Sequence, residues 1–206
     1  MNYQTEQEEF WAGSFGDEYI SRNKSTQLLA SNLNFFSRVL KQAGKPESLI
    51  EFGANVGMNL KAIQLLYPEI QLYAIEINEK AAYELANVIG SSNVYNESIL
   101  DFSAEKQSEV ALIKGVLIHI NPSLLDTVYK KLYEASSKYI LICEYYNPSP
   151  VAINYRGNDN RLFKRDFAGE MLEKYDDLSL IDYGFVYKRD PAFPQDDITW
   201  FLIKKK

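Results

Sequence analysis

A glycine turn at residues 49–59 carries the strongest chemical signal in the sequence. The segment reads Leu-Ile-Glu-Phe-Gly-Ala-Asn-Val-Gly-Met-Asn, an apolar run that reaches Glu51 and is followed by Gly53 and Gly57. Glycine at such positions permits a tight turn and a close approach between backbone and ligand, because the Cβ is absent. Glu51 puts a carboxylate where a dinucleotide-binding turn holds a pyrophosphate, and a carboxylate repels phosphate but attracts an ammonium group. The turn therefore favours a nucleotide cofactor with an amino-acid end, although similar turns also occur without a ligand.

A second acidic residue follows the next apolar run. The segment Tyr-Ala-Ile-Glu-Ile ends at Glu76 and Ile77, and Glu76 lies 76 − 51 = 25 residues beyond Glu51. A carboxylate at the end of a second strand accepts hydrogen bonds from ribose hydroxyls in nucleotide-binding folds. Further along, Ser98 and Ile99 offer a polar and an apolar side chain to the edge and face of an adenine. These residues together predict nucleoside binding.

Few side chains could act as a base or a nucleophile. The chain has one histidine, His119, and one cysteine, Cys143, too few for a zinc cluster. His119 follows a predicted strand and is the first candidate for a general base or an orienting group, with a structural histidine near the cofactor as the alternative. Tyr146 is a weaker catalytic candidate. Cys143 lies inside an apolar run, so we expect an inert core thiol.

Charge is unevenly distributed along the chain. The net charge of −6 disfavours non-specific nucleic-acid binding. Residues 155–166 carry four cations and two anions, a local 4 − 2 = +2, so the remainder totals −6 − 2 = −8. Together with Tyr155 these cations could bind an anionic acceptor, although a solvated helix start explains them equally well. The four cations are Arg156, Arg161, Lys164 and Arg165.

Alternating strand and helix patterns predict the framework that positions these residues. Apolar runs predict strands at residues 48–52, 71–77, 93–96, 110–115, 138–146, 178–187 and 198–203. Amphipathic segments predict helices at 26–43, with Ser25 as the cap, and at 57–66, 79–89, 122–136 and 165–175. Repeated strand–helix units require a mainly parallel sheet with helices on both faces, and the last two strands add an antiparallel hairpin strand. The sequence therefore predicts an α/β fold with a seven-stranded, mostly parallel sheet.

Length and composition predict one domain over residues 1–206. With 206 residues, of which 46% are hydrophobic, the chain can bury one good core but hardly two. We expect residues 1–45 to form an N-terminal cap and first helix, and residues 46–206 to form the core. No run reaches the roughly 18 apolar residues of a membrane span, and the acidic start differs from a signal peptide. A cytoplasmic protein without membrane contact is the expectation.

The order of these motifs resembles the class I S-adenosylmethionine-dependent methyltransferases. Glu-x-Gly-x-x-x-Gly, Glu76, the Ser98-Ile99 pair and the Gly-Val-Leu-Ile-His-Ile run occur in family order across about residues 45–145. The resemblance implies a Rossmann-like fold and S-adenosyl-L-methionine as cofactor. Asn55 and Asn59 depart from the residues that many relatives carry at the glycine turn. The implied cofactor-binding residues are Tyr19, Arg22, Glu51, Gly53, Asn55, Gly57, Glu76, Ile77, Ser98, Ile99 and Lys114.

Segments outside this core resemble the methylases associated with pseudaminic acid biosynthesis. The likeness rests on residues 10–23, Glu-Tyr-Tyr-Asn-Pro-Ser-Pro at 144–150, two segments within 155–167, and Phe-Pro-Gln-Asp-Asp at 193–197. It implies methyl transfer to a nonulosonic acid or a related sugar or sugar nucleotide, a small anionic molecule, and O-methylation is the first choice. The candidate acceptor-binding residues are Tyr146, Asn147, Tyr155, Arg156, Arg161, Lys164, Arg165, Gln195 and Asp196.

Other functions remain open at the level of sequence. N-methylation or carboxyl methylation of a small molecule needs less help from a base and rivals O-methylation. A regulator that binds S-adenosylmethionine without catalysis is a further alternative. The Tyr-Asn-Pro-Ser-Pro segment at 146–150 is similar to a loop of nucleic-acid N-methyltransferases, but it follows the fifth strand where theirs follows the fourth. An NAD-dependent oxidoreductase would need a third glycine in the turn, where Asn59 stands. The sequence predicts no oligomeric state.

Overall fold

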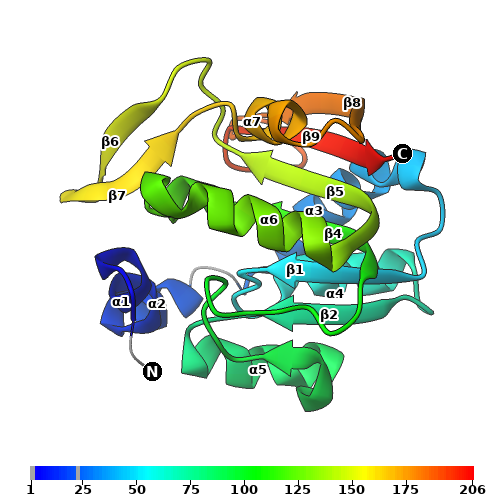
Figure 1. The fold of residues 1–206 in the computed structure, drawn as a ribbon. Helices are drawn as coiled ribbons and strands as arrows, with labels where there is room; N and C mark the ends of the chain where they lie inside the picture. Colours follow the sequence, from blue (N-terminus) through cyan, green and yellow to red (C-terminus); the bar gives the residue numbers. More distant parts are fainter. Residues whose placement is uncertain (1–2, 22–23) are drawn as a thin grey trace.

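A seven-stranded sheet forms the centre of the computed structural model, which describes residues 3–21 and 24–206 (Figure 1). Its strand order is β3-β2-β1-β4-β5-β9-β8. The first five strands of that order pair in parallel, and β9 is antiparallel to both β5 and β8. The strands are β1 (Ser48–Phe52), β2 (Gln71–Ile75), β3 (Val94–Tyr95), β4 (Ser108–Lys114), β5 (Ser136–Glu144), β8 (Leu178–Val186) and β9 (Ile198–Lys205). The predicted fold, with its antiparallel C-terminal hairpin strand, is confirmed.

Helices cover both faces of the sheet. One face packs against α3 (Thr26–Val39), α4 (Met58–Leu66) and α5 (Glu79–Ile89), and the other against α6 (Leu125–Ala135) and α7 (Phe167–Lys174). Successive residues of β1 alternate between the two cores, since Leu49 belongs to the first and Ile50 to the second. A sheet covered on both faces needs strands that are apolar throughout, which explains why continuous apolar runs predicted these strands.

Helix ends lie close to the predicted positions. Ser25 caps α3 as predicted, because its Oγ accepts a hydrogen bond from the Leu28 N–H at 3.0 Å. The α-helix ends at Val39 and is followed by a 3₁₀ turn at Lys41–Ala43. Similarly, the helix predicted at 122–136 begins with a 3₁₀ turn at Pro122–Leu124 before α6.

Residues 155–166, which the sequence allowed to be a helix start, lie mostly in a β-hairpin. Strands β6 (Val151–Tyr155) and β7 (Asn158–Lys164) pair with each other and lie apart from the main sheet (Figure 1). The two connecting residues, Arg156 and Gly157, have φ values of 53° and 83°. Two consecutive left-handed residues are what a tight two-residue hairpin turn requires. The helix predicted at 165–175 therefore begins later, at Phe167.

Two short helices precede α3 and form what we call the N-terminal lid, α1 (Glu6–Ala12) and α2 (Ser14–Ile20). Thr5 and Glu8 start α1 with a reciprocal capping box: the Thr5 Oγ accepts the Glu8 N–H at 3.2 Å, and the Glu8 carboxyl accepts the Thr5 N–H at 2.9 Å. Asn78, between β2 and α5, donates from Nδ2 to the Asp17 Oδ1 at 3.0 Å. The lid is thus fixed to the core of the sheet beside β2.

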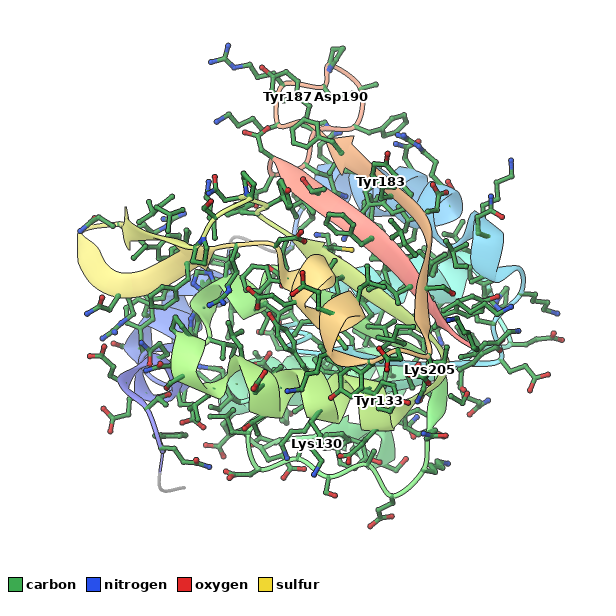
Figure 2. The ribbon with its side chains drawn as sticks, turned by 45° about the horizontal axis from the view of Figure 1, so that its top comes forward. Lys130, Tyr133, Tyr183, Tyr187, Asp190 and Lys205 are labelled. Atoms are coloured by element: carbon green, nitrogen blue, oxygen red, sulfur yellow. The ribbon has the colours of Figure 1, made fainter. Side chains whose placement is uncertain are left out.

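Strand β8 forms one edge of the sheet and leads into a loop of residues 187–197. Tyr183 is exposed along β8, and Tyr187 and Asp190 form the turn at the outer end of the loop (Figure 2). Lys205, at the end of β9, places its Nζ 3.8 Å from the centroid of the Tyr133 ring of α6 (Figure 2). Since β8 runs parallel to β1–β5, the loop begins at the carboxyl edge of the sheet, where the site described below lies.

Candidate functional site

A cavity of about 670 Å³ opens at the carboxyl ends of the parallel strands. The glycine turn after β1, the loops after β2, β3 and β4, the lid and the 187–197 loop all contribute to its wall. This size and position are typical of ligand sites in open α/β sheets. The cavity brings together most of the predicted residues: Tyr19, Gly53, Asn55, Glu76, Ile77, Ser98, Ile99, Lys114, His119, Tyr155, Arg156, Gln195 and Asp196.

The glycine turn owes its shape to left-handed backbone. Gly53 has φ 75°, and a Cβ there would lie 2.7 Å from a methyl group of Val116, so another residue would be both strained and crowded. Asn55 has φ 51°, and asparagine is one of the few other residues that adopt this conformation readily. Gly57, with φ 79°, is needed for a different reason than predicted. Its missing Cβ would lie 2.7 Å from Leu85 of α5, and Gly57 does not line the cavity.

Glu51 lies directly behind the cavity wall. The side chain is fully buried, and its Oε1 accepts a hydrogen bond at 2.6 Å from Nδ2 of Asn59, which does line the cavity. Within the described residues, the Glu51 Oε2 has no hydrogen-bond partner. Burial raises the pKa of Glu51 to about 8, against the opposing effects of Asn59 and the Lys114 ammonium. An unpartnered buried carboxyl oxygen is unusual and can be satisfied by a cationic donor.

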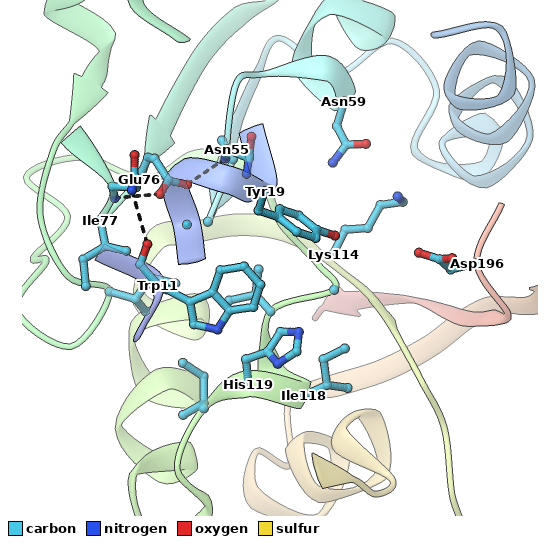
Figure 3. Close-up of a pocket in the computed structure, with 18 of the residues that line it drawn as sticks. Trp11, Tyr19, Asn55, Asn59, Glu76, Ile77, Lys114, Ile118, His119 and Asp196 are labelled. Carbon is cyan, nitrogen blue, oxygen red and sulfur yellow. Dashed lines mark hydrogen bonds between the residues drawn. The ribbon is translucent and has the colours of Figure 1, made fainter. Parts of the chain in front are cut away.

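Glu76 is held by the backbone at the end of β2 (Figure 3). One oxygen accepts the Asn55 N–H at 2.7 Å and the other the Asn78 N–H at 2.8 Å. Burial nevertheless raises the pKa of Glu76, since the effect of removing it from water exceeds that of these hydrogen bonds. A third backbone N–H, that of Ile77, also acts on this carboxyl group. A carboxylate offers about four acceptor sites, so Glu76 retains capacity for a ribose hydroxyl.

His119 lies between two aromatic rings at the cavity. Its ring centroid is 4.7 Å from that of Trp11 and 5.0 Å from that of Tyr155, and Figure 3 shows it beside Trp11 and Ile118. The Nδ1 is 2.5 Å from the backbone carbonyl oxygen of Arg161. Because a carbonyl can only accept, Nδ1 carries the proton and Nε2 has the lone pair. Burial lowers the pKa of His119 to about 4, so the ring is neutral at pH 7.

The two adjacent tyrosines after β5 have different surroundings. Tyr145 lines the cavity, and its pKa is raised by burial and by the nearby Asp196 carboxylate. Tyr146 is 42% exposed, faces Phe201 on β9 and does not line the cavity. Opposite orientation of neighbouring side chains explains the difference. The structure thus places Tyr145, and not Tyr146, in the cavity wall. Asn147 also lies outside, where its Nδ2 donates to the Ser149 carbonyl at 2.5 Å.

Three of the four cations of residues 155–166 do not line the cavity. Arg161 pairs with Glu6 of α1 at 2.7 Å, and Arg165 pairs with Glu170 of α7 at 2.5 Å. Lys164 lies over the Tyr145 ring, with its Nζ 5.1 Å from the centroid. None of these three lines the cavity, so the structure does not bring them together with Arg156 at its wall. Acidic partners engage the two guanidinium groups instead, Glu6 at 155 residues from Arg161 in the sequence and Glu170 at five residues from Arg165.

Several cavity residues were not predicted. Trp11, Gln7 and Glu8 of the lid, together with Lys188 of the 187–197 loop, all line the cavity. The spacing of Thr5 and Glu8 matches a capping box and could have revealed the helix that carries them. Lys188 carries no comparable signal. Arg22, a predicted cofactor-binding residue, lies outside the described residues.

Residues 3–21 and 24–206 offer neither a metal-binding cluster nor a membrane-spanning helix. No group of three or more histidine, cysteine, aspartate or glutamate side chains is placed to hold a metal ion there. None of the helices in these ranges combines the length and apolar character needed to span a membrane.

Comparison with solved structures identifies the fold. The 1,6-didemethyltoxoflavin N1-methyltransferase of Burkholderia thailandensis, solved with 1,6-didemethyltoxoflavin and S-adenosylhomocysteine, has a TM-score of 0.72 at 15% identity, over 97% of this chain and 87% of that one. The magnesium protoporphyrin IX methyltransferase of Synechocystis PCC 6803, solved with S-adenosylmethionine, has a TM-score of 0.68 at 11% identity, over 100% of both chains. A plantazolicin methyltransferase, solved with S-adenosylhomocysteine, has a TM-score of 0.65 at 16% identity, over 97% of this chain and 94% of that one. No family model matches the chain, and neither does any curated protein sequence. The chain has the Rossmann-like fold of class I methyltransferases.

Proposed function

We propose that this protein is an S-adenosyl-L-methionine-dependent methyltransferase acting on a small molecule. The observation that carries the proposal is the placement of two buried carboxyl groups, Glu51 and Glu76, behind and beside one cavity, separated by the left-handed glycine turn. That pair matches a cofactor with an ammonium group at one end and a ribose in the middle. The fold supports the same proposal, since the solved neighbours were crystallised with S-adenosylmethionine or S-adenosylhomocysteine.

The residues present fit this cofactor. Glu76 would accept hydrogen bonds from the ribose hydroxyls, and the unpartnered Oε2 of Glu51 would be satisfied by the ammonium group. The cation of Lys114, with Tyr19 beside it in Figure 3, would bind the carboxylate end. Ile77 and Ile99 would cover the adenine. When bound, the cofactor supplies an activated methyl group, so the protein's tasks are to align the acceptor and to exclude water.

O-methylation of a nonulosonic acid or related sugar remains the proposed reaction. The Nε2 lone pair of His119 is suited to take the proton of an acceptor hydroxyl, which makes His119 the proposed base. Arg156 and Lys188 in the cavity wall favour an anionic acceptor. Asp196 in the same wall would instead suit an amine, which keeps N-methylation as the second candidate.

Thermal shift measurements test the donor. S-adenosylhomocysteine should raise the melting temperature and NAD should not. Glu76→Ala should reduce the shift, whereas Glu79→Ala, an exposed glutamate at the start of α5, should leave it unchanged. A melting curve moved by NAD and indifferent to S-adenosylhomocysteine would contradict the proposal. A protein that binds the donor but methylates no sugar, amine or carboxylate acceptor would support the non-catalytic regulator.

Mass spectrometry of candidate acceptors incubated with enzyme and donor tests the substrate class. A single methyl increment is expected on acidic sugars. Arg156→Ala should raise the KM for such an acceptor about tenfold or more, by removing a charged hydrogen bond. Arg165→Ala is the matched control, because Arg165 pairs with Glu170 outside the cavity. Methylation of amines alone would overturn the O-methyl assignment.

A further inference from the structure

The cavity wall includes a group of aliphatic side chains together with Ser98 and Glu8, which hydrogen-bond to each other, and we call this part of the wall the slot. Its aliphatic side chains suit the faces of a purine. These are Ile77, Ile99, Leu100, Ile120 and Leu124. Two polar side chains meet at the edge of the slot, Ser98 after β3 and Glu8 from the lid helix α1. Both side chains are buried, at 3% and 7% exposure.

The single donor proton of Ser98 is already used. Its hydroxyl donates to the Glu8 Oε1 at 2.5 Å, and its oxygen accepts the Leu100 N–H at 3.1 Å. A hydroxyl has one proton, so Ser98 cannot also donate to a ligand without releasing Glu8. Ser98 therefore orients Glu8, whose carboxyl group is the stronger hydrogen-bond acceptor of the two.

Glu8 lines the cavity and retains an acceptor site. Its Oε2 accepts hydrogen bonds from the Gln4 N–H at 2.8 Å, the Thr5 N–H at 2.9 Å and the Thr5 hydroxyl at 3.1 Å. Among the residues that the structure describes, Ser98 is the hydrogen-bond donor to Oε1. A carboxyl oxygen can accept two hydrogen bonds, so Oε1 has room for one more donor.

We propose that Glu8 of the N-terminal lid recognises the exocyclic amino group of the cofactor's adenine. The proposal rests on the proposed function, because it takes the cofactor to be an adenosyl compound. An amino group donates to the open site on Oε1, whereas the carbonyl oxygen of a 6-oxo purine would face another acceptor. The lid thus takes part in base recognition, and adenine contributes a hydrogen bond that holds α1 against the loop after β3.

Isothermal titration calorimetry with S-adenosylhomocysteine and S-inosylhomocysteine tests this role. The two ligands differ at the purine edge, where adenine has an amino group beside an unprotonated N1 and hypoxanthine has an oxo group beside a protonated N1. Wild-type protein should prefer the adenosyl ligand about 10- to 100-fold, as expected for one hydrogen bond to a charged group. In Glu8→Gln the amide oxygen should keep the backbone contacts of α1 and turn the NH₂ toward the slot, so the preference should fall at least about tenfold. Exposed Glu9 on the same helix provides the control, and Glu9→Gln should preserve the wild-type ratio.

The outcomes separate the two proposals. If wild-type protein binds S-adenosylhomocysteine but discriminates less than about threefold, the role of Glu8 is refuted while the proposed function stands. If Glu8→Gln keeps the wild-type ratio of the two affinities, the role of Glu8 is likewise refuted while the proposed function stands. If wild-type protein binds neither ligand, the proposed function fails and the role of Glu8 with it. The wild-type comparison alone remains decisive if Glu8→Gln does not fold.

Discussion

The imidazole of His119 donates its Nδ1 proton to the backbone carbonyl of Arg161, at 2.5 Å. Arg161 belongs to β7, so the hairpin that follows the main parallel strands fixes the orientation of a ring that lines the cavity. Trp11 of the lid packs against the same ring at 4.7 Å between centroids. The proposed base is therefore set by two segments that lie outside the repeating strand–helix units.

Histidine NMR tests this arrangement directly, because the chain has one histidine. We expect the ring carbon-bound protons to titrate with a pKa of about 4 and the nitrogen shifts at pH 7 to report the Nδ1–H tautomer. Burial favours the neutral ring and lowers the pKa. A pKa near the ordinary 6.5, or the Nε2–H tautomer, would be inconsistent with the structure.

Replacement of His119 by phenylalanine separates catalysis from packing. His119→Phe keeps an aromatic ring between Trp11 and Tyr155 but removes the Nε2 lone pair. With a hydroxyl acceptor, kcat should fall by about 10²- to 10⁴-fold, the usual contribution of a general base. Affinity for S-adenosylhomocysteine, measured by calorimetry, should stay within about threefold. An unchanged kcat would assign His119 a structural role instead.

Glu51→Gln should stabilise the ligand-free protein at alkaline pH and weaken donor binding. The pKa of Glu51 is raised from 4.5 to about 8, so the folded state holds a proton that the unfolded chain releases above pH 4.5. Wild-type stability therefore declines as pH rises from about 4.5 to 8, and glutamine, which cannot ionise, avoids that loss. We expect a gain of about 2–4 kcal/mol in the free energy of unfolding at pH 8.

Urea unfolding at pH 5 and pH 8 measures this effect, and the two proteins should differ little at pH 5. Glutamine can still accept the hydrogen bond from Asn59, so the comparison isolates the charge. Equal differences at both pH values would show that the proton on Glu51 does not contribute. Loss of the carboxylate should also reduce the thermal shift produced by S-adenosylhomocysteine, since its ammonium group loses a charged partner.

The adjacent tyrosines after β5 form a natural matched pair. Tyr145→Phe should lower kcat/KM for the acceptor about tenfold, because the lost hydroxyl lies in the cavity near Asp196. Tyr146→Phe should have no measurable effect, since Tyr146 faces Phe201 outside the cavity. Steady-state kinetics on the two variants compares them, and the reverse ranking would place the acceptor on the other face of β5.

Asn78 should control how firmly the lid is held. Its Nδ2 donates to Asp17 at 3.0 Å and to the Ala12 carbonyl at 3.3 Å, while its Oδ1 caps α5 through the Ala81 N–H at 3.0 Å. Asn78→Asp preserves the cap, removes the donors and places a carboxylate against Asp17. Hydrogen exchange at residues 6–20 should accelerate about tenfold or more, whereas exchange in α4 should not change. Equal protection of the lid in both proteins would show that other contacts hold it.

Local patterns explain what the sequence could predict. Strands covered on both faces are uniformly apolar, and Ser25 and the glycines end or start helices through local chemistry. The residues that we propose for the donor follow the strands directly, so Gly53, Glu76 and Ser98 could be identified from strand ends alone. Their positions relative to one another are a consequence of the parallel sheet.

Contacts between residues far apart in the sequence explain the features that the sequence could not predict. Arg161 looked available for an anion, but its partner Glu6 is 155 residues away in the sequence. Glu8 reaches Ser98 across 90 residues, so no local pattern indicates that a lid residue enters the adenine slot. The β6–β7 hairpin was missed because Arg156–Gly157 is not among the common hairpin turn sequences, such as Asn-Gly, although it adopts the same left-handed backbone.

The cavity wall divides according to the origin of its segments. The loops after β1, β2 and β3 and the lid contribute the residues that we propose for the donor, whereas the hairpin and the 187–197 loop contribute those that we propose for the acceptor. Exchanging the hairpin tip or that loop between homologues would thus diversify acceptor choice without disturbing the glycine turn. Directed-evolution libraries confined to these insertions should retain folded, donor-competent enzymes and concentrate variation where a new substrate would be accommodated.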